Sequence, residues 1–144
     1  MVLIYTGIEE IDKEIQNYVK DSIIVHYSDY LIETNNFEGQ TAIISPEAIE
    51  GNIHEFLFWL KKLNMRVILL LKDKRQEENK IALQLGIYDI LYGNFYPSQI
   101  KDILENPKSF NDISDLYKKV FNVKLQKKKK LRDEKVYTFF SDRY

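Results

Sequence analysis

Residues 67–71, VILLL, are the part of the sequence that most constrains the fold. Five consecutive aliphatic residues without polar alternation are typical of a strand that is buried on both faces. Such strands lie at the centre of parallel sheets, where helices cover both sides. The stretch therefore predicts a three-layer α/β architecture with this strand inside the sheet.

Shorter stretches of β-type and helix-type sequence alternate along the rest of the chain. Strands are predicted at residues 2–5, 22–27, 41–45, 67–71 and 88–93, and helices at 8–19, 29–33, 46–63, 76–86 and 96–107. In the first helix, Asp12 is one of the polar residues between apolar positions. Ser45 is expected to cap the 46–63 helix, and Gly51 to split it.

The strand spacing predicts the order of the sheet. Strands follow one another at intervals of roughly 20 residues, with a helix between most of them, as in parallel sheets with right-handed crossovers. We therefore expect a flavodoxin-like three-layer sandwich, with a five-stranded parallel sheet in the order 2-1-3-4-5.

The composition limits the kinds of site that the chain can build. The chain has no cysteine and only two histidines, which excludes disulfides and thiolate metal sites, and we expect neither a metal nor a cofactor. The N-terminus lacks a basic segment before its apolar residues. No stretch approaches the roughly 20 apolar residues of a membrane span. These features predict a cytoplasmic protein without a membrane span.

Charge is distributed unevenly between the body and the C-terminal part of the chain. Residues 1–117 carry 11 Lys/Arg and 19 Asp/Glu, a net charge of −8, whereas residues 118–144 carry 10 and 3, a net charge of +7. Apolar residues from Ile113 to Phe121 keep helical spacing. We therefore expect an α/β domain at residues 1–109 and a helical, basic linker at 110–134.

The segment LGIYDILYGNFYPSQIKDIL at residues 85–104 resembles the last strand and helix of response-regulator receiver domains. The residues that match the family pattern are Gly86, Asp89, Ile90, Leu91, Phe95 and Pro97. The family's catalytic lysine falls on Gly93, and the proline that follows it falls on Asn94. At the level of pattern the resemblance covers about residues 1–105 and implies a receiver-like fold.

The other positions that carry receiver chemistry also differ from the family. The acidic pair that would hold magnesium falls on Gly7 and Ile8, the phosphoacceptor aspartate on Ser45, and the hydroxyl residue on Leu71. Phosphoryl transfer to aspartate needs a carboxylate nucleophile, a metal ion and a cation. The resemblance therefore implies a pseudo-receiver, which keeps the fold and is not an enzyme.

The ending DEKVYTFFS, residues 133–141, is similar to the segment that opens MinD/ParA-type ATPase domains. In that family a glycine-rich phosphate-binding loop follows, whereas here the sequence continues Asp142-Arg143-Tyr144. CpaE-like ATPases of pilus assembly join a receiver-like domain to such an ATPase, so the two resemblances support one another. We expect residues 135–144 to begin a following ATPase domain or to form an extra edge strand.

Three groups of residues are candidate contact surfaces. Phe58 and Trp59 fall beside the core stripe of their helix, which favours either a buried aromatic edge or a partner surface. A second candidate surface comprises Tyr92, Phe95 and Tyr96. The third, basic group is Lys127, Lys128, Lys129, Lys130 and Arg132, which either contacts nucleic acid or forms a solvated linker.

These features predict a non-catalytic regulatory module of a MinD/ParA-type ATPase. Its partners would be another protein, a second copy of the chain, or the ATPase domain in cis, and it would serve in dimerisation or localisation. Two alternatives are a nucleic-acid-binding module that uses the basic tail and a standalone adaptor that works without phosphorylation.

Overall fold

A parallel five-stranded sheet forms the centre of the protein. The structure is a computed structural model that describes residues 1–33 and 35–123. The strands are β1 (Val2–Tyr5), β2 (Ser22–Ile24), β3 (Thr41–Ile44), β4 (Arg66–Leu71) and β5 (Asp89–Tyr92). They pair in the order β2-β1-β3-β4-β5, and every pairing is parallel. The predicted flavodoxin-like order is therefore confirmed.

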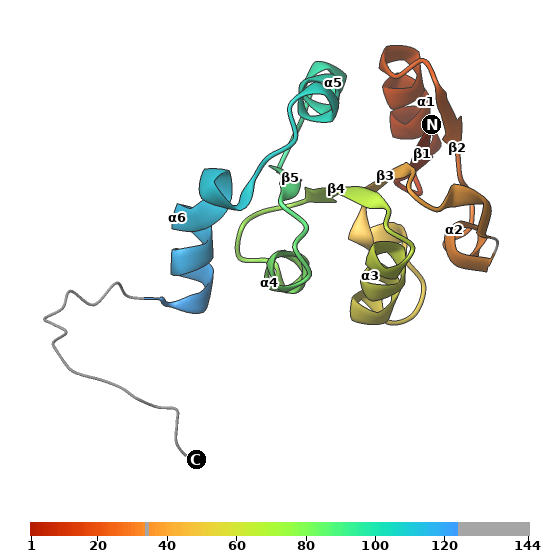
Figure 1. The fold of residues 1–144 in the computed structure, drawn as a ribbon. Coiled ribbons are helices and arrows are strands. Elements are labelled where there is room, and N and C mark those ends of the chain that lie inside the picture. The colour runs from red at the N-terminus through yellow and green to blue at the C-terminus, as the bar shows by residue number, and fades with distance from the viewer. Residues whose placement is uncertain (34, 124–144) are drawn as a thin grey trace, which may run out of the picture.

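Helices cover both faces of this sheet (Figure 1). Helices α1 (Glu9–Tyr18) and α5 (Pro97–Glu105) lie on one face and contact each other. The other face carries α2 (Asp29–Glu33), α3 (Ile53–Lys62), α4 (Glu77–Gln84) and α6 (Phe110–Phe121). The chain therefore has the three layers that its central strand predicts.

Strand β4 shows why its sequence has no polar alternation. Ile68 and Leu70 face the core beneath α1 and α5, whereas Val67, Leu69 and Leu71 face the core beneath α3 and α4. All five side chains are buried. Because both faces of the strand are covered, both sets of alternating positions are apolar.

The segment between β3 and α3 begins differently from the prediction. Residues Pro46–Ala48 form only a short 3₁₀ turn, η2, and the Ser45 side chain makes no capping hydrogen bond. Gly51 has a φ of +91°, so the chain turns there, as expected of a split helix. The cap of α3 is Asn52, whose Oδ1 accepts a hydrogen bond of 2.9 Å from the Glu55 backbone N–H. The expectation that Ser45 caps this helix was wrong, because Asn52 directly precedes the first full turn.

Helix α6 extends the layer that contains α4 beyond the edge of the sheet (Figure 1). Ser109 begins the helix in a capping box with Asp112, and Ile113 is buried in the core. Leu116, Tyr117, Val120 and Phe121 pack against the same core. The apolar spacing therefore corresponds to a helix that packs on the α/β domain. Residues 124–144, which include residues 124–134 of the expected linker and the expected strand at 135–144, lie outside the described residues.

No helix within residues 1–33 and 35–123 combines the length and the apolar character needed to span a membrane.

Candidate functional site

A pocket of about 290 Å³ lies at the carboxyl edge of the sheet. Ligands of open α/β sheets usually bind at this edge, where strand order reverses. Its walls come from the segments that follow β1, β3, β4 and β5. The lining residues are Thr6, Ile8, Ile11, Ser45, Glu47, Leu70, Leu71, Lys72, Gly93, Asn94 and Phe95. The pocket therefore brings together four of the positions that the receiver resemblance identifies, namely Ile8, Ser45, Leu71 and Gly93.

Gly7, the fifth of these positions, lies next to this pocket but serves the packing of its loop. Its φ is +77°, and a Cβ built there would lie 2.8 Å from the Cβ of Ala48. The β1–α1 loop therefore passes so close to η2 that a side chain at residue 7 would force one of the two segments to move. An acidic residue could not replace Gly7 without that movement.

Asp12 is a buried carboxylate close to this pocket, because it bonds to the lining residue Thr6. Its hydrogen bonds hold the β1–α1 loop. Only 3% of the residue is exposed. Its Oδ1 accepts hydrogen bonds from the Thr6 backbone N–H at 3.0 Å and from the Thr6 Oγ1 hydroxyl at 2.6 Å. Asp12 lies among the acidic residues of the first turn of α1, as the sequence pattern predicts, and the loop that precedes the helix additionally buries its carboxylate.

A cation reaches the pocket from the end of β4. The Lys72 Nζ lies 2.9 Å from the Glu47 carboxylate, and the hydrogen bond to Glu47 raises the pKa of the Lys72 ammonium. Glu47 is the only acidic residue in the lining of this pocket, so its charge is offset by Lys72. Both side chains are exposed to solvent, and the pair is therefore sensitive to salt.

The remaining polar groups of the pocket are hydroxyls, an amide and backbone groups. The Ser45 N–H donates to the Tyr5 carbonyl at 3.0 Å, and the Gly93 N–H donates to the Leu71 carbonyl at 2.8 Å. These bonds continue the sheet pairing just past the strands. Within residues 1–33 and 35–123, no three His, Asp or Glu side chains converge to form a metal site. The pocket can supply hydrogen bonds and one compensated charge to a ligand.

Phe58 and Trp59 are exposed side by side on α3. The exposed fractions are 48% for Phe58 and 43% for Trp59, whereas Phe56, Leu57 and Leu60 are buried. The two rings meet edge to face with centroids 6.0 Å apart, and the Lys62 Nζ lies 4.8 Å from the Trp59 ring. We call Phe58 and Trp59 the α3 aromatic edge.

Tyr92, Phe95 and Tyr96 occupy three different environments. The Tyr92 hydroxyl donates to Asn79 Oδ1 at 2.6 Å beneath α4, and burial raises the Tyr92 pKa to about 12. Phe95 lines the pocket at the carboxyl edge of the sheet and packs against the core beneath α1 and α5. Tyr96 is 75% exposed at the start of α5. Only Tyr96 therefore presents most of its surface to solvent.

The basic candidates Lys127, Lys128, Lys129, Lys130 and Arg132 lie outside the described residues. The scan of protein-family models gave no match for this chain. The search of curated proteins likewise gave no match.

Proposed function

We propose that this chain is a non-catalytic interaction module, a pseudo-receiver that regulates a MinD/ParA-type ATPase. The observation that carries the proposal is that a serine, Ser45, follows β3 at the position of the receiver phosphoacceptor. Ser45 lines the pocket at the carboxyl edge of the sheet, which we call the edge pocket, together with Leu71 and Gly93. A serine hydroxyl there cannot form an acyl phosphate, and the only acidic residue in the lining is paired with Lys72. The edge pocket therefore favours a structural or binding role.

The α3 aromatic edge is the surface that would bind the partner. Aromatic side chains that are nearly half exposed, as Phe58 and Trp59 are, leave apolar surface uncovered, and such residues are enriched at the centres of interfaces. Phe58 and Trp59 do not belong to either buried core cluster, so substitutions at these positions should leave the fold intact. The partner would be a second copy of the chain or the ATPase domain itself.

The connection to an ATPase rests on residues 133–141, which resemble the first strand of that domain. The reading frame beyond Tyr144 tests it directly. A glycine-rich phosphate-binding loop encoded there supports the proposal, and a frame that encodes any other sequence contradicts the link to an ATPase in cis.

The interaction surface can be tested with the fluorescence of Trp59, which is the only tryptophan of the chain. We expect sedimentation velocity to detect association of the chain with itself or with the ATPase domain, and the Trp59 emission to shift as the complex forms. Phe58→Ser should abolish both signals. Tyr18→Ser, which removes a similarly exposed aromatic side chain from α1, is the matched control. Association that survives Phe58→Ser, or no association with either partner, contradicts the proposal.

The absence of phosphoryl transfer has a separate test. We expect incubation with Mg²⁺ and acetyl phosphate to leave the mass of the protein unchanged, and beryllofluoride to leave its spectrum unchanged. Stoichiometric phosphorylation of an aspartate would contradict the pseudo-receiver proposal.

A further inference from the structure

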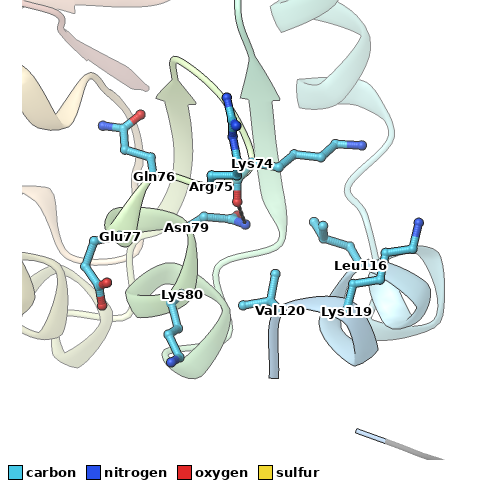
Figure 2. A pocket seen from close by; sticks show the side chains of 9 residues that line it. All are labelled: Lys74, Arg75, Gln76, Glu77, Asn79, Lys80, Leu116, Lys119 and Val120. Carbon is cyan, nitrogen blue, oxygen red and sulfur yellow. Dashed lines mark hydrogen bonds between the residues drawn. The ribbon is translucent and has the colours of Figure 1, made fainter. Parts of the chain in front are cut away.

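A second hollow, larger than the edge pocket, lies between α4 and α6. Its volume is about 420 Å³. Figure 2 shows Leu116 and Val120 on α6 pointing toward the loop before α4 and toward α4 itself. These two side chains are only half-buried, so they present apolar surface to the hollow. Small-molecule sites of proteins usually have volumes of about 300–1,000 Å³ and walls that are mainly apolar, so this hollow has a suitable size.

Asn79 forms the floor of the hollow, and hydrogen bonds to both its amide nitrogen and its amide oxygen fix its side chain. Asn79 is 1% exposed. Its Nδ2 donates to the Lys74 carbonyl at 2.9 Å, and its Oδ1 accepts a hydrogen bond of 2.6 Å from the Tyr92 hydroxyl. The amide therefore fixes the loop before α4 to β5. A preformed floor reduces the entropy that binding would otherwise cost.

The rim of the hollow is positively charged. Four cationic residues line it, Lys74, Arg75, Lys80 and Lys119, together with a single acidic residue, Glu77. The Lys74 Nζ lies 5.6 Å from the Tyr92 ring, and the Lys80 Nζ lies 5.7 Å from the Phe121 ring. Among the described residues, Lys74, Lys80 and Lys119 form no ion pair with a carboxylate. The local charge of this surface is therefore positive, although residues 1–117 as a whole are acidic.

We propose that this hollow binds an organic anion. The apolar body of the ligand lies against Leu116 and Val120, and its anionic group lies among the ammonium groups of Lys74 and Lys119. An apolar wall favours burial of a hydrocarbon or aromatic group, and a rim of cations favours a negative charge at its mouth. The site is separate from both the edge pocket and the α3 aromatic edge, so it goes beyond the proposed interaction function.

Binding at this site has a consequence for α6. The ligand would contact α4 and α6 at once, and a ligand that binds only the docked arrangement stabilises that arrangement. Because α6 connects the α/β domain to residues 124–144, the anion would strengthen the docking of the helix that leads into the basic segment.

The fluorescent anion 1-anilinonaphthalene-8-sulfonate is a suitable probe, since it combines an aromatic body with one sulfonate. We expect it to bind the full chain saturably with one site per chain. Lys119→Glu should weaken binding about tenfold, because reversing one rim charge both removes an attraction and adds a repulsion. Lys101→Glu makes the same change on exposed α5, at the other face of the sheet, and should leave the affinity unchanged.

Two further titrations distinguish binding in this hollow from nonspecific binding of the probe to apolar surface. The uncharged analogue N-phenyl-1-naphthylamine should bind about tenfold more weakly than the sulfonate. Phe58→Ser should leave the sulfonate titration unchanged, which excludes the α3 aromatic edge as its site. The proposal is overturned by a lack of saturation, by equal affinity for the neutral analogue, or by equal losses in Lys119→Glu and Lys101→Glu.

Hydrogen exchange provides a readout that does not depend on probe fluorescence. At saturating sulfonate, the backbone amides of residues 116–121 should exchange several-fold more slowly, and those of α5 should not change. Lys80→Glu should reduce this protection, and circular dichroism would verify that each variant keeps the fold. Unchanged exchange in α6 at saturation would overturn the proposed link between the ligand and helix docking.

Discussion

Arg66, at the first residue of β4, forms an ion pair with Asp89, at the first residue of β5. The Arg66 Nε lies 3.0 Å from the Asp89 carboxylate. The same guanidinium donates hydrogen bonds to the Leu104 carbonyl at 3.0 Å and to the Ile103 carbonyl at the end of α5. The other Asp89 oxygen accepts a bond of 2.8 Å from the Lys108 backbone N–H. Two side chains thus connect the sheet to the end of α5 and to the segment that follows it.

Arg66→Met should lower the free energy of unfolding by about 3 kcal/mol, because it leaves the buried Asp89 carboxylate without its cation. Urea titration followed by circular dichroism measures the change. Lys101→Met, on the exposed face of α5, should change the stability by less than about 0.5 kcal/mol.

The double variant Arg66→Met/Asp89→Leu gives the control for that pair. It should be more stable than Arg66→Met alone, since no unpaired buried charge remains. If the loss of unfolding free energy in the double variant equals the sum of the losses in Arg66→Met and Asp89→Leu, the two residues act independently.

Tyr92→Phe should remove the hydrogen bond to Asn79 and cost about 1–3 kcal/mol, because the buried Asn79 Oδ1 loses its donor. The pKa of Tyr92 is raised by burial from 10.0 to about 12. Its contribution is therefore complete below pH 10 and is lost as the pH rises through about 12, since the unfolded state gives up the proton first.

The measurement for Tyr92 is the difference in unfolding free energy between the native chain and Tyr92→Phe as the pH rises. That difference should shrink from pH 10 toward pH 12. Other tyrosines contribute equally to both chains and cancel. A difference that stays constant over this interval would contradict a buried, protonated Tyr92.

The layers and the sheet order could be predicted from the sequence because their signals are local. The apolar run of β4, the turn at Gly51 and the position of Phe58 and Trp59 beside the α3 core stripe all depend on spacing within one element. These local patterns do not depend on how the helices pack, provided that both faces of the sheet are covered.

The polar contacts that define the sites could not be predicted, because they join residues that are distant in the sequence or lie across a loop. Asp89 pairs with Arg66 across 23 positions, and Tyr92 bonds to Asn79 across 13. Asp12 looked like one more acidic residue of α1 until the β1–α1 loop placed Thr6 against it. The cationic hollow required α4 and α6 to lie side by side, which helical spacing alone does not specify.

Gly7→Ala should destabilise the protein by at least about 2 kcal/mol, because it combines a left-handed backbone with a new contact against Ala48. Gly39→Ala is a matched control, since Gly39 has a similar φ of +78° and nothing within 4 Å of its ideal Cβ position. That control should cost about 1 kcal/mol from backbone strain alone. Equal losses in the two variants would show that η2 moves freely away from residue 7.

Ser109→Ala should loosen the start of α6. The Ser109 N–H and hydroxyl both donate to the Asp112 carboxylate, and these bonds lower the Asp112 pKa below 3.8. The contribution of the capping box is therefore present above pH 3.8 and is lost as the pH falls through the lower pKa of the folded state. Hydrogen exchange in α6 should accelerate on acidification before exchange in the sheet does.

Ser114→Ala distinguishes the cap from a general effect of losing a hydroxyl on this helix. Within the described part of the chain, the Ser114 hydroxyl bonds only to the Asn111 carbonyl, so its removal should leave the acid dependence of α6 unchanged. Ser109→Ala should cost the helix about 1 kcal/mol at neutral pH. It should remove only part of that acid dependence, because the backbone N–H of residue 109 still donates to the Asp112 carboxylate. Because α6 forms one wall of the cationic hollow, Ser109→Ala should also weaken sulfonate binding, whereas Ser114→Ala should not. If the α6 amides of Ser109→Ala exchange rapidly but the sulfonate still binds with normal affinity, then binding in the hollow does not depend on the docking of α6.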